Sequence, residues 1–285
     1  MPVFSIITVC LNAEQCIRET IQSVLNQTST NFEYIIKDGL SSDKTVNIAQ
    51  SFTDAFAQRG ISYRIISRKD SGIYDAMNQA VQETKGEWIN FMNAGDRFAT
   101  PTILDQVERD PHFREADIVY GDSIRQDQQL FQFSKARNLE YFRLGLPFCH
   151  QSCFTKRDLF KNRKYSTKLV VNSDYLFYSE YYKENKRFIY VPIPISIIDA
   201  NGISSNWRLT YPEKLNMLEK MPIRDEDAIQ SLKKVISRQK RKEFMHKHLW
   251  RFIPKGLREK RRKLIKKKAG WKTEEEFFGI KKGDI

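Results

Sequence analysis

Short apolar stretches alternate with segments of helical periodicity along the first 125 residues of the chain. The stretch 4–9 is typical of a buried strand, and Ile17, Ile21 and Val24 then recur at helical spacing. The same alternation predicts further strands at 34–36, 61–66 and 88–92, and helices around 46–52, at 73–81 and after a Thr100-Pro101 N-cap. Strand and helix repeat four times, which predicts parallel strands joined by right-handed crossovers.

The alternation is less regular beyond residue 125. Apolar runs predict strands at 130–133, 148–154 and 188–198, and a helix over 174–183 with Ser173 as its cap. This half is expected to complete the same sheet. From Trp207 onward the pattern is largely helical.

Composition indicates a folded protein. The chain has 285 residues with 40% hydrophobic and 12% aromatic side chains, enough for one large or two small domains. It has no run of 18 apolar residues and no basic segment followed by an apolar one at its start, so we expect neither a spanning helix nor a secretory signal, and a cytoplasmic location. The four cysteines are expected to be reduced, and Cys149 and Cys153 lack the second His-Cys grouping that a zinc site requires.

The net charge of +13 is unevenly distributed. Residues 231–268 hold 17 Lys and Arg against two Glu, whereas residues 1–230 hold 28 Lys and Arg against 29 Asp and Glu. A protein that binds nucleic acid normally spreads positive charge over its folded surface. The distribution favours a nearly neutral body with a cationic appendage.

Acidic residues follow several of the predicted strands. Asp38, Asp70 and Asp96 each lie beside a glycine in the loop after a strand. Ligands of open parallel sheets bind outside the carboxyl ends of the strands, so these loops are the candidate site. Each aspartate taken alone is more typical of a helix cap or a turn than of a binding site, and it is their joint placement at successive strand ends that favours a site.

Carboxylates gathered at one edge repel one another unless a cation or ligand offsets their charge. A divalent Mg²⁺ or Mn²⁺ ion takes one or two protein carboxylates and completes its coordination with water and phosphate oxygens, which suits a phosphorylated substrate. The chain has neither G-x-x-x-x-G-K-[ST] nor G-x-G-x-x-G after the first strand. These absences argue against a P-loop NTPase and a dinucleotide dehydrogenase.

Several motifs, in order, resemble family 2 glycosyltransferases of the GT-A fold. They are residues 5–12 (SIITVCLN), 21–28 (IQSVLNQT), 38–45 (DGLSSDKT), 70–78 (DSGIYDAMN), 85–96 (KGEWINFMNAGD), 147–151 (PFCHQ) and 172–175 (NSDY), so the likeness covers roughly residues 3–205. It implies an α/β fold with a Rossmann-like, mixed, mostly parallel sheet flanked by helices. We therefore expect a catalytic domain over 1–205, with a nucleotide-sugar-binding half at 1–125 and an acceptor-binding half at 126–205, and a helical, basic extension at 206–285.

The resemblance also implies roles for individual residues. Thr8, Asn12, Asp38 and Asp70 match positions that bind the nucleotide, and a buried polar contact from Asp38 would select the base. Asp96 matches the last acid of the family's metal-binding element. The sequence Asn93-Ala94-Gly95-Asp96 supplies one carboxylate where many members have two. The Mg²⁺ or Mn²⁺ ion is therefore expected to be held mainly by the donor itself.

Inverting transfer needs one general base to deprotonate the acceptor hydroxyl. Asp174 matches the family's base, and the helix dipole would keep it ionised; the alternative is an ordinary aspartate in a first helical turn. His150 is read either as a polar group contacting the phosphates or acceptor, or as a buried structural histidine. Arg208 is read either as a clamp on the diphosphate or as a solvated arginine.

The basic stretch 231–268 interleaves cations with aromatic and aliphatic residues, as interfacial helices on anionic membranes do. A solvated helix packed on the body is the alternative. The expected protein is an inverting glycosyltransferase with a UDP- or GDP-sugar donor, a glycan or lipid-linked acceptor and no nucleic-acid partner. It would act in cell-surface polysaccharide or lipopolysaccharide synthesis, in the cytoplasm and peripherally on the inner face of the membrane.

Two other functions explain part of the pattern. A sugar-phosphate nucleotidyltransferase normally has a Gly-rich, basic loop near its first strand, whereas residues 8–20 contain Arg18 as their single cation and no glycine. A non-enzymatic nucleic-acid-binding protein would account for the basic stretch but would leave the acidic loops without a role.

Overall fold

The structure is a computed structural model that describes residues 1–220, 225–249, 259 and 264–278. The chain divides into two compact units. Unit 1 comprises Met1–Ile124 and Ser134–Asp199, and unit 2 comprises Arg125–Phe133 and Ala200–Ile285.

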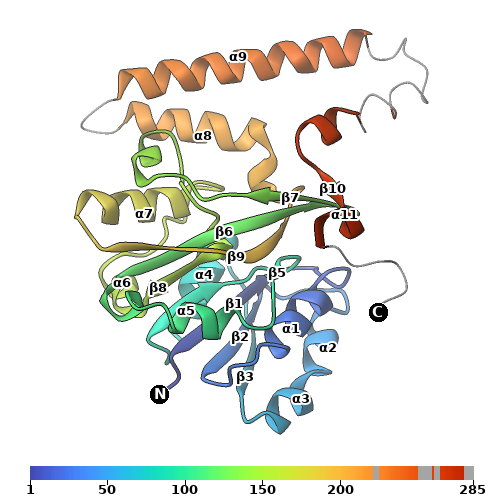
Figure 1. Cartoon of the computed structure of the whole chain (residues 1–285), viewed down its shortest axis with the longest axis vertical. Coiled ribbons are helices and arrows are strands. Elements are labelled where there is room, and N and C mark those ends of the chain that lie inside the picture. Colours follow the sequence, from blue (N-terminus) through green and yellow to red (C-terminus); the bar gives the residue numbers. More distant parts are fainter. Residues whose placement is uncertain (221–224, 250–258, 260–263, 279–285) are drawn as a thin grey trace. The chain divides into compact units, whose positions relative to one another are not determined.

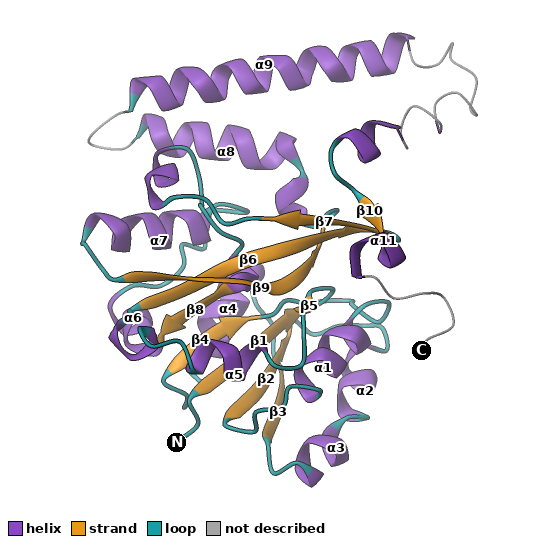
Figure 2. Ribbon diagram, viewed as in Figure 1, coloured by secondary structure: helices purple, strands orange, loops and turns teal. Residues whose placement is uncertain are grey.

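The first half of unit 1 is a parallel sheet (Figures 1 and 2). Its strands are β1 (Phe4–Cys10), β2 (Phe32–Asp38), β3 (Ser62–Ser67) and β4 (Trp88–Phe91). Strand β1 pairs in parallel with β2 and with β4, and β2 pairs in parallel with β3. The predicted parallel pairing through crossovers is therefore confirmed, and the carboxyl ends of these strands lie at one edge.

Every residue of β1 and β2 is buried, as expected when helices cover both faces of a parallel sheet. On one face Phe4 and Ile6 share a hydrophobic cluster with Ile17 and Ile21 of the first helix. On the other face the helix α4 (Ile73–Val81) packs on β1 and β2.

The helices of this half differ from the predicted ones at two places. They are α1 (Ile17–Leu25), α2 (Thr45–Gln50), α3 (Thr53–Gln58), α4 (Ile73–Val81) and α5 (Ile103–Glu108). The helix predicted around 46–52 breaks at Ser51 and continues as α3. The predicted Thr100-Pro101 start of α5 was wrong: α5 is capped at Thr102, because the carbonyls of Thr100 and Pro101 accept hydrogen bonds from residues 27 and 28.

The second half of unit 1 extends the sheet with antiparallel strands. They are β5 (Arg97–Phe98), β6 (Ile118–Asp127), which runs on into unit 2, β8 (Cys153–Lys156) and β9 (Phe188–Asp199). Strand β8 pairs antiparallel with β4 and β6, and β5 pairs antiparallel with β9. The expected α/β fold, with a mixed sheet flanked by helices, is confirmed.

The helical segments here are α6 (Arg157–Asn162), α7 (Ser173–Lys183) and the 3-10 turns η1 (Phe113–Glu115), η2 (Leu139–Arg143) and η3 (His150–Ser152). The strand predicted at 148–154 was wrong in its first part, because the chain turns through η3 before β8 begins. Ser173 lies inside α7 rather than capping it. Its hydroxyl instead accepts a hydrogen bond from the Ser166 N–H at 2.5 Å.

Unit 2 contains β7 (Leu130–Ser134, of which Ser134 belongs to unit 1), η4 (Ile203–Ser205), α8 (Trp207–Glu219), α9 (Glu226–Leu249), β10 (Lys272–Thr273) and α11 (Glu274–Phe278). The helices α8 and α9 run side by side, joined by an ion pair of 2.8 Å between Glu219 and Lys233 (Figure 1). The prediction of largely helical structure from Trp207 is confirmed for the described residues. Within those residues, no helix combines the length and the apolar character needed to cross a membrane.

Candidate active site

The loops after β1 and β2 are tied together by hydrogen bonds. Asn12 lies in a left-handed backbone conformation, and its Oδ1 accepts from the Ser42 N–H at 2.9 Å. The Asn12 N–H donates to Ser41 Oγ at 2.8 Å, and the Ala13 N–H donates to Thr45 Oγ1 at 2.7 Å. A few polar side chains of the second loop therefore fix the backbone of the first.

Asp38 ends β2 and is completely buried. Its carboxylate accepts from the N–H groups of Leu40 and Ser41, each at 3.1 Å, and from the hydroxyls of Ser41 at 2.5 Å and Ser67 at 2.6 Å. A buried carboxylate is stable only when it is hydrogen-bonded in this way. Asp38 therefore holds the loop after β2 and connects it to the end of β3.

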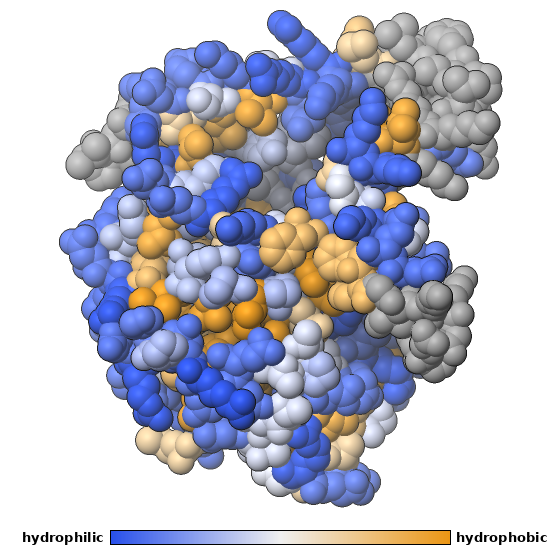
Figure 3. Space-filling view, viewed as in Figure 1, coloured by the Kyte–Doolittle hydropathy of each residue, from blue (hydrophilic) through white to orange (hydrophobic). Residues whose placement is uncertain are grey.

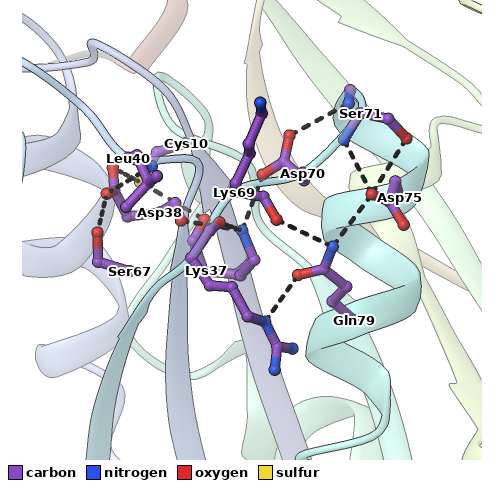
Figure 4. A network of polar contacts seen from close by, with 12 residues as sticks. Cys10, Lys37, Asp38, Leu40, Ser67, Lys69, Asp70, Ser71, Asp75 and Gln79 are labelled. Atoms are coloured by element: carbon purple, nitrogen blue, oxygen red, sulfur yellow. Dashed lines mark hydrogen bonds and ion pairs between the residues drawn. The ribbon is translucent and has the colours of Figure 1, made fainter.

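Lys37, next to Asp38, is also fully buried, and its ammonium group joins β2 to the loop after β3 (Figure 4). Lys37 Nζ donates to the backbone carbonyls of Asp38 at 2.9 Å and Arg68 at 2.6 Å, and forms an ion pair with Asp70 Oδ2 at 2.8 Å. A Cβ added to Gly39 would lie 2.9 Å from the same Asp70 oxygen. Asp38, Gly39 and Asp70 are thus close neighbours.

The loop after β3 leads directly into α4. Gly72 caps this helix with φ of 127°, a conformation that L side chains rarely adopt. Asp75 in the first turn accepts from the Ser71 N–H at 2.8 Å, and this bond lowers the pKa of Asp75 (Figure 4). The Gly72 N–H donates to Asp70 Oδ1 at 3.1 Å, so Asp70 is fixed through both oxygens.

Asp96 follows β4, and its side chain is buried. Its Oδ2 accepts from Gln151 Nε2 at 2.6 Å, and its Oδ1 accepts from the Asp199 N–H at 3.1 Å. Burial raises the pKa of Asp96 to about 7, although these two hydrogen bonds act in the opposite direction. Cys16 lies beside this loop, with its Sγ 3.7 Å from the position of a Cβ on Gly95, so the loop after β4 lies against the loop after β1.

Asp174 lies half-buried in the first turn of α7. Its Oδ1 accepts from Tyr74 Oη of α4 at 3.1 Å and from the Tyr175 N–H at 2.8 Å. Tyr74 comes two residues after Gly72, so the loop after β3 and the start of α7 meet through this side chain.

His150, the first residue of the turn η3, is buried. Its Nε2 lies 2.9 Å from Tyr165 Oη, with which it shares a hydrogen bond. Burial lowers the pKa of His150, while the Asp174 carboxylate acts to raise it. The segment 149–151 thus lies close to both acids. The Asp174 carboxylate acts on the pKa of His150, and Gln151 donates a hydrogen bond to Asp96.

The structure brings Asn12, Asp38 and Asp70 together at one end of the parallel strands, and Asp96, His150 and Asp174 around the segment 149–151. Thr8 lies apart from both groups. Its hydroxyl, with no exposure, donates to the Met92 carbonyl at 2.6 Å and lies 2.7 Å from Tyr34 Oη inside the sheet. Arg208 of unit 2 pairs with Glu243 at 2.5 Å.

Three residues of the site were not singled out from the sequence: Lys37, Tyr74 and Gln151. A lysine directly after the apolar run Tyr34-Ile35-Ile36 is the one available signal, because a strand buried on both faces leaves no solvent for its charge. Tyr74 and Gln151 lie within the motifs 70–78 and 147–151, but their partners are distant in sequence.

The described residues offer some, but not all, of the ligands that a hard divalent cation requires. Among the described residues no group of three His, Cys, Asp or Glu side chains could hold an ion by itself. Asp96 offers a buried carboxylate, and Asn93 Oδ1 in the same loop is buried without a hydrogen-bond partner. Two oxygens of this kind suit Mg²⁺ or Mn²⁺ when a bound phosphate completes the coordination.

Comparison with known proteins identifies the family. The profile described as glycosyl transferase family 2 matches residues 5–190. The chain therefore belongs to this family, as its motifs predicted.

Two curated relatives and one solved structure illustrate the likeness. A PGL/p-HBAD biosynthesis glycosyltransferase of Mycobacterium tuberculosis is 34% identical over 164 residues, which cover 56% of this chain and 61% of the relative. The Escherichia coli UDP-Glc:alpha-D-GlcNAc-diphosphoundecaprenol beta-1,3-glucosyltransferase WfaP is 33% identical over 123 residues, 42% of this chain and 44% of the relative. The chain thus spans less than two thirds of the length of either relative.

A mannosyltransferase from Pyrobaculum calidifontis, solved in complex with GDP-Man and Mn²⁺, aligns with a TM-score of 0.60 and 14% identity over 77% of this chain and 64% of its own. At this level of identity the comparison shows the shared fold, and the expected GT-A architecture is confirmed.

Proposed function

We propose that the chain is an inverting glycosyltransferase that moves a sugar from a UDP- or GDP-sugar to a hydroxyl acceptor. Catalysis is assigned to residues 1–205, with the donor in the half 1–125 and the acceptor in the half 126–205; residues 206–285 form a basic extension. The observation that carries the proposal is that Asp96 and Asp174 both act on the short segment 149–151: Gln151 Nε2 donates to Asp96 at 2.6 Å, and the Asp174 carboxylate acts to raise the pKa of His150. The family's metal ligand and base would then act at one place.

Each of the two carboxylates has a separate task in this reaction. The acceptor hydroxyl attacks the anomeric carbon of the donor sugar while Asp174 takes the hydroxyl proton. The bond between that carbon and the diphosphate oxygen breaks, and the nucleoside diphosphate leaves with the electron pair. Attack from the face opposite the leaving group inverts the anomeric configuration.

The donor is expected to bind over the loops after β1, β2 and β3. Asn12, Asp38 and Asp70 shape this surface, and the buried Lys37 holds it in one geometry. A preorganised surface binds a ligand without an ordering cost, so it favours selectivity for one base. The hydroxyl of Thr8 is buried inside the sheet, so Thr8 supports β1 rather than contacting the nucleotide as expected. His150, buried near Asp174, supports the reacting end.

Asp96 and Asn93 would hold a Mg²⁺ or Mn²⁺ ion. When bound, the ion neutralises the negative charge that develops on the leaving diphosphate. The solved mannosyltransferase of the same fold contains Mn²⁺, which supports this assignment.

The acceptor is proposed to be a glycan or a lipid-linked sugar of the cell surface. The names of both curated relatives support this class, since one acts in PGL/p-HBAD biosynthesis and the other on a diphosphoundecaprenol-linked sugar. A lipid-linked acceptor would require the protein to work peripherally at the inner face of the membrane.

A thermal-shift panel tests the donor and the metal. UDP, GDP, UDP-glucose, UDP-N-acetylglucosamine and GDP-mannose are each added with and without Mn²⁺, because a ligand of the native state raises the melting temperature. We expect one base to be selected and Mn²⁺ to increase its shift. Asp96→Asn should remove the Mn²⁺-dependent part, whereas Asp174→Asn should keep the donor shift and abolish transfer. Loss of donor binding in Asp174→Asn would argue against its role as base.

Two product assays complete the test. Slow release of nucleoside diphosphate from the selected donor indicates glycosyl transfer to water, whereas pyrophosphate formed from NTP and sugar phosphate would indicate a nucleotidyltransferase. The anomeric configuration of the first-formed sugar, followed by NMR, distinguishes inversion from retention.

The basic stretch 231–268 is proposed to bind an anionic membrane surface. Part of it lies outside the described residues, but α9 presents exposed cations at Lys234, Arg238, Arg241 and Lys242 close to exposed Phe244 and Met245. In Figure 3 the outer side of α9 is mainly hydrophilic, and hydrophobic side chains gather between α9 and α8. Each Lys or Arg near such a surface contributes about 1 kcal/mol, and the effect falls off within a Debye length.

Cosedimentation of the full chain with vesicles tests this binding. We expect binding to vesicles containing phosphatidylglycerol, little binding to pure phosphatidylcholine, and release at high salt. Arg241→Glu with Lys242→Glu should weaken the binding, and exchanging the exposed Lys161 of α6 for Glu is the control. Equal binding to both vesicle types would rule out the proposal.

A further inference from the structure

The hydroxyl group of Tyr74 lies at the start of α7, although Tyr74 belongs to α4. Tyr74 is 6% exposed, and its Oη lies 3.1 Å from Asp174 Oδ1, to which it donates. Burial raises the pKa of Tyr74 well above its usual value, so the hydroxyl keeps its proton and remains a donor.

The backbone at the start of α7, at Ser173 and Asp174, also acts on this hydroxyl, in the direction that lowers the pKa of Tyr74. Tyr74 of α4 is therefore held against the first turn of α7 by its bond to Asp174.

Among the described residues, the other groups whose pKa responds to Asp174 are neutral. They are His150 of η3, Tyr165 of the loop before α7, and Cys149, which precedes His150. Burial lowers the pKa of His150 and raises the pKa of Cys149 to about 12, so neither carries charge near neutral pH. Unlike these three groups, Tyr74 donates a hydrogen bond to the Asp174 carboxylate from its side chain.

The two oxygens of Asp174 have different surroundings. Oδ1 accepts from Tyr74 and from the Tyr175 N–H at 2.8 Å, whereas no described residue donates a hydrogen bond to Oδ2. A carboxylate oxygen that already accepts two hydrogen bonds is a weaker proton acceptor than one that accepts none.

We propose that Tyr74 is a positioning residue for the base: it fixes Asp174 through Oδ1, so that Oδ2 faces the acceptor hydroxyl and takes its proton. This inference rests on the proposed function, because it assigns the base of that reaction one reactive oxygen. It also connects the two halves of the site, since Tyr74 follows the loop of Asp70 that Lys37 holds in place.

Tyr74→Phe tests this role, because it removes the hydroxyl and keeps the ring that packs against Tyr165 at a centroid distance of 5.5 Å. The rate is the release of nucleoside diphosphate from UDP-glucose, UDP-N-acetylglucosamine or GDP-mannose, whichever the wild type uses best. We expect this rate to fall by about 10- to 100-fold, the usual effect of losing a hydrogen bond to a charged group. The affinity for UDP or GDP should stay within about twofold, because the nucleotide does not contact the base.

The pH dependence gives a second readout. Without the Tyr74 hydrogen bond the ionised base is less stabilised, so the acid side of the rate profile should move to higher pH. In an Asp174→Asn background, Tyr74→Phe should cause no further loss of rate, because the two residues act as a unit.

Tyr181→Phe is the matched control. Tyr181 is also buried, lies on α7 and donates its hydroxyl to the Leu159 carbonyl at 2.5 Å, away from Asp174. It should leave the pH profile unchanged. If the wild type is active and Tyr74→Phe has the same rate and the same pH profile, the proposed role of Tyr74 is overturned while the proposed function stands. A wild type that releases no nucleoside diphosphate from any of the three donors would overturn the proposed function, and this inference with it.

Discussion

The ammonium group of Lys37 lies 2.8 Å from Asp70 Oδ2, with the lysine side chain fully buried and the aspartate side chain 11% exposed. Three acceptors surround this ammonium group, two of which are backbone carbonyls at the ends of β2 and β3 (Figure 4). A buried charge is tolerated only in such fully bonded surroundings. The pair therefore fixes the relative positions of the two loops where the donor is proposed to bind.

Lys37→Met should destabilise the protein strongly. The exchange keeps the apolar length of the side chain but leaves Asp70 and two carbonyls without their donor, and breaking a buried pair from one side typically costs about 3–5 kcal/mol. Urea denaturation should show a lower midpoint with an unchanged slope. The affinity for the selected nucleoside diphosphate should fall as well.

An exposed lysine provides the comparison for this variant. Lys161 pairs with Asp158 at 2.7 Å, but the two side chains are 68% and 76% exposed. Lys161→Met should cost no more than about 1 kcal/mol, the usual range of a surface pair. Equal effects of the two exchanges would show that burial of the Lys37 pair has no energetic importance.

Gly39→Ala should disturb the same contact from the other side. The added Cβ would lie 2.9 Å from Asp70 Oδ2, an atom that Lys37 prevents from moving freely. Overpacking of this kind costs about 1–3 kcal/mol, measurable by urea denaturation. The loss should be smaller when Asp70 is also exchanged for Ala, and simple additivity of the two changes would contradict the contact.

Asp38→Asn should weaken the loop after β2. An amide offers one acceptor oxygen where the carboxylate has two, so the N–H groups of Leu40 and Ser41 and the Ser67 hydroxyl cannot all be satisfied. Unsatisfied buried donors cost about 1–3 kcal/mol, so the urea midpoint and the nucleotide affinity should both fall. Asp54→Asn, at an exposed position in α3, is the control and should have little effect on either measurement.

The parallel half of the fold could be predicted from sequence because its signals are local. Apolar strands and amphipathic helices such as α4 follow one another with little interruption, and the structure has α4 over the predicted 73–81. The turn η3 could not be predicted, because Phe148 and Phe154 have the apolar pattern of a strand while the bonds of Gln151 and Ser152 depend on distant partners. Strand β6 does not follow from the sequence for a similar reason: Gly121 and Asp122, residue types common in turns, interrupt its apolar pattern.

The site divides in the same way. Acidic residues after strands are visible in the sequence, because parallel strands bring their carboxyl ends to one edge. The pairing of Lys37 with Asp70 and of Tyr74 with Asp174 is set by the register of β2 against β3 and by the packing of α4, which no local pattern encodes. The sequence therefore indicates which loops form the site, whereas the structure is needed to show which side chains position the reacting groups.

His150→Gln should reduce the dependence of stability on acid pH. Burial lowers the pKa of His150 below 6.5, so between that lowered value and 6.5 the unfolded chain binds a proton that the folded chain does not. Stability of the wild type therefore falls as pH decreases through this window, by at most about 1.4 kcal/mol per pH unit from this residue. A glutamine can keep a hydrogen bond to Tyr165 but does not titrate, so the difference in urea midpoint between pH 7.5 and pH 5 should be smaller in the variant.

His112→Gln removes a histidine whose side chain is 59% exposed and serves as the control for the loss of an imidazole. If the wild type and His150→Gln lose the same stability between the two pH values, His150 is not held neutral by burial, and its placement beside Asp174 has to be revised.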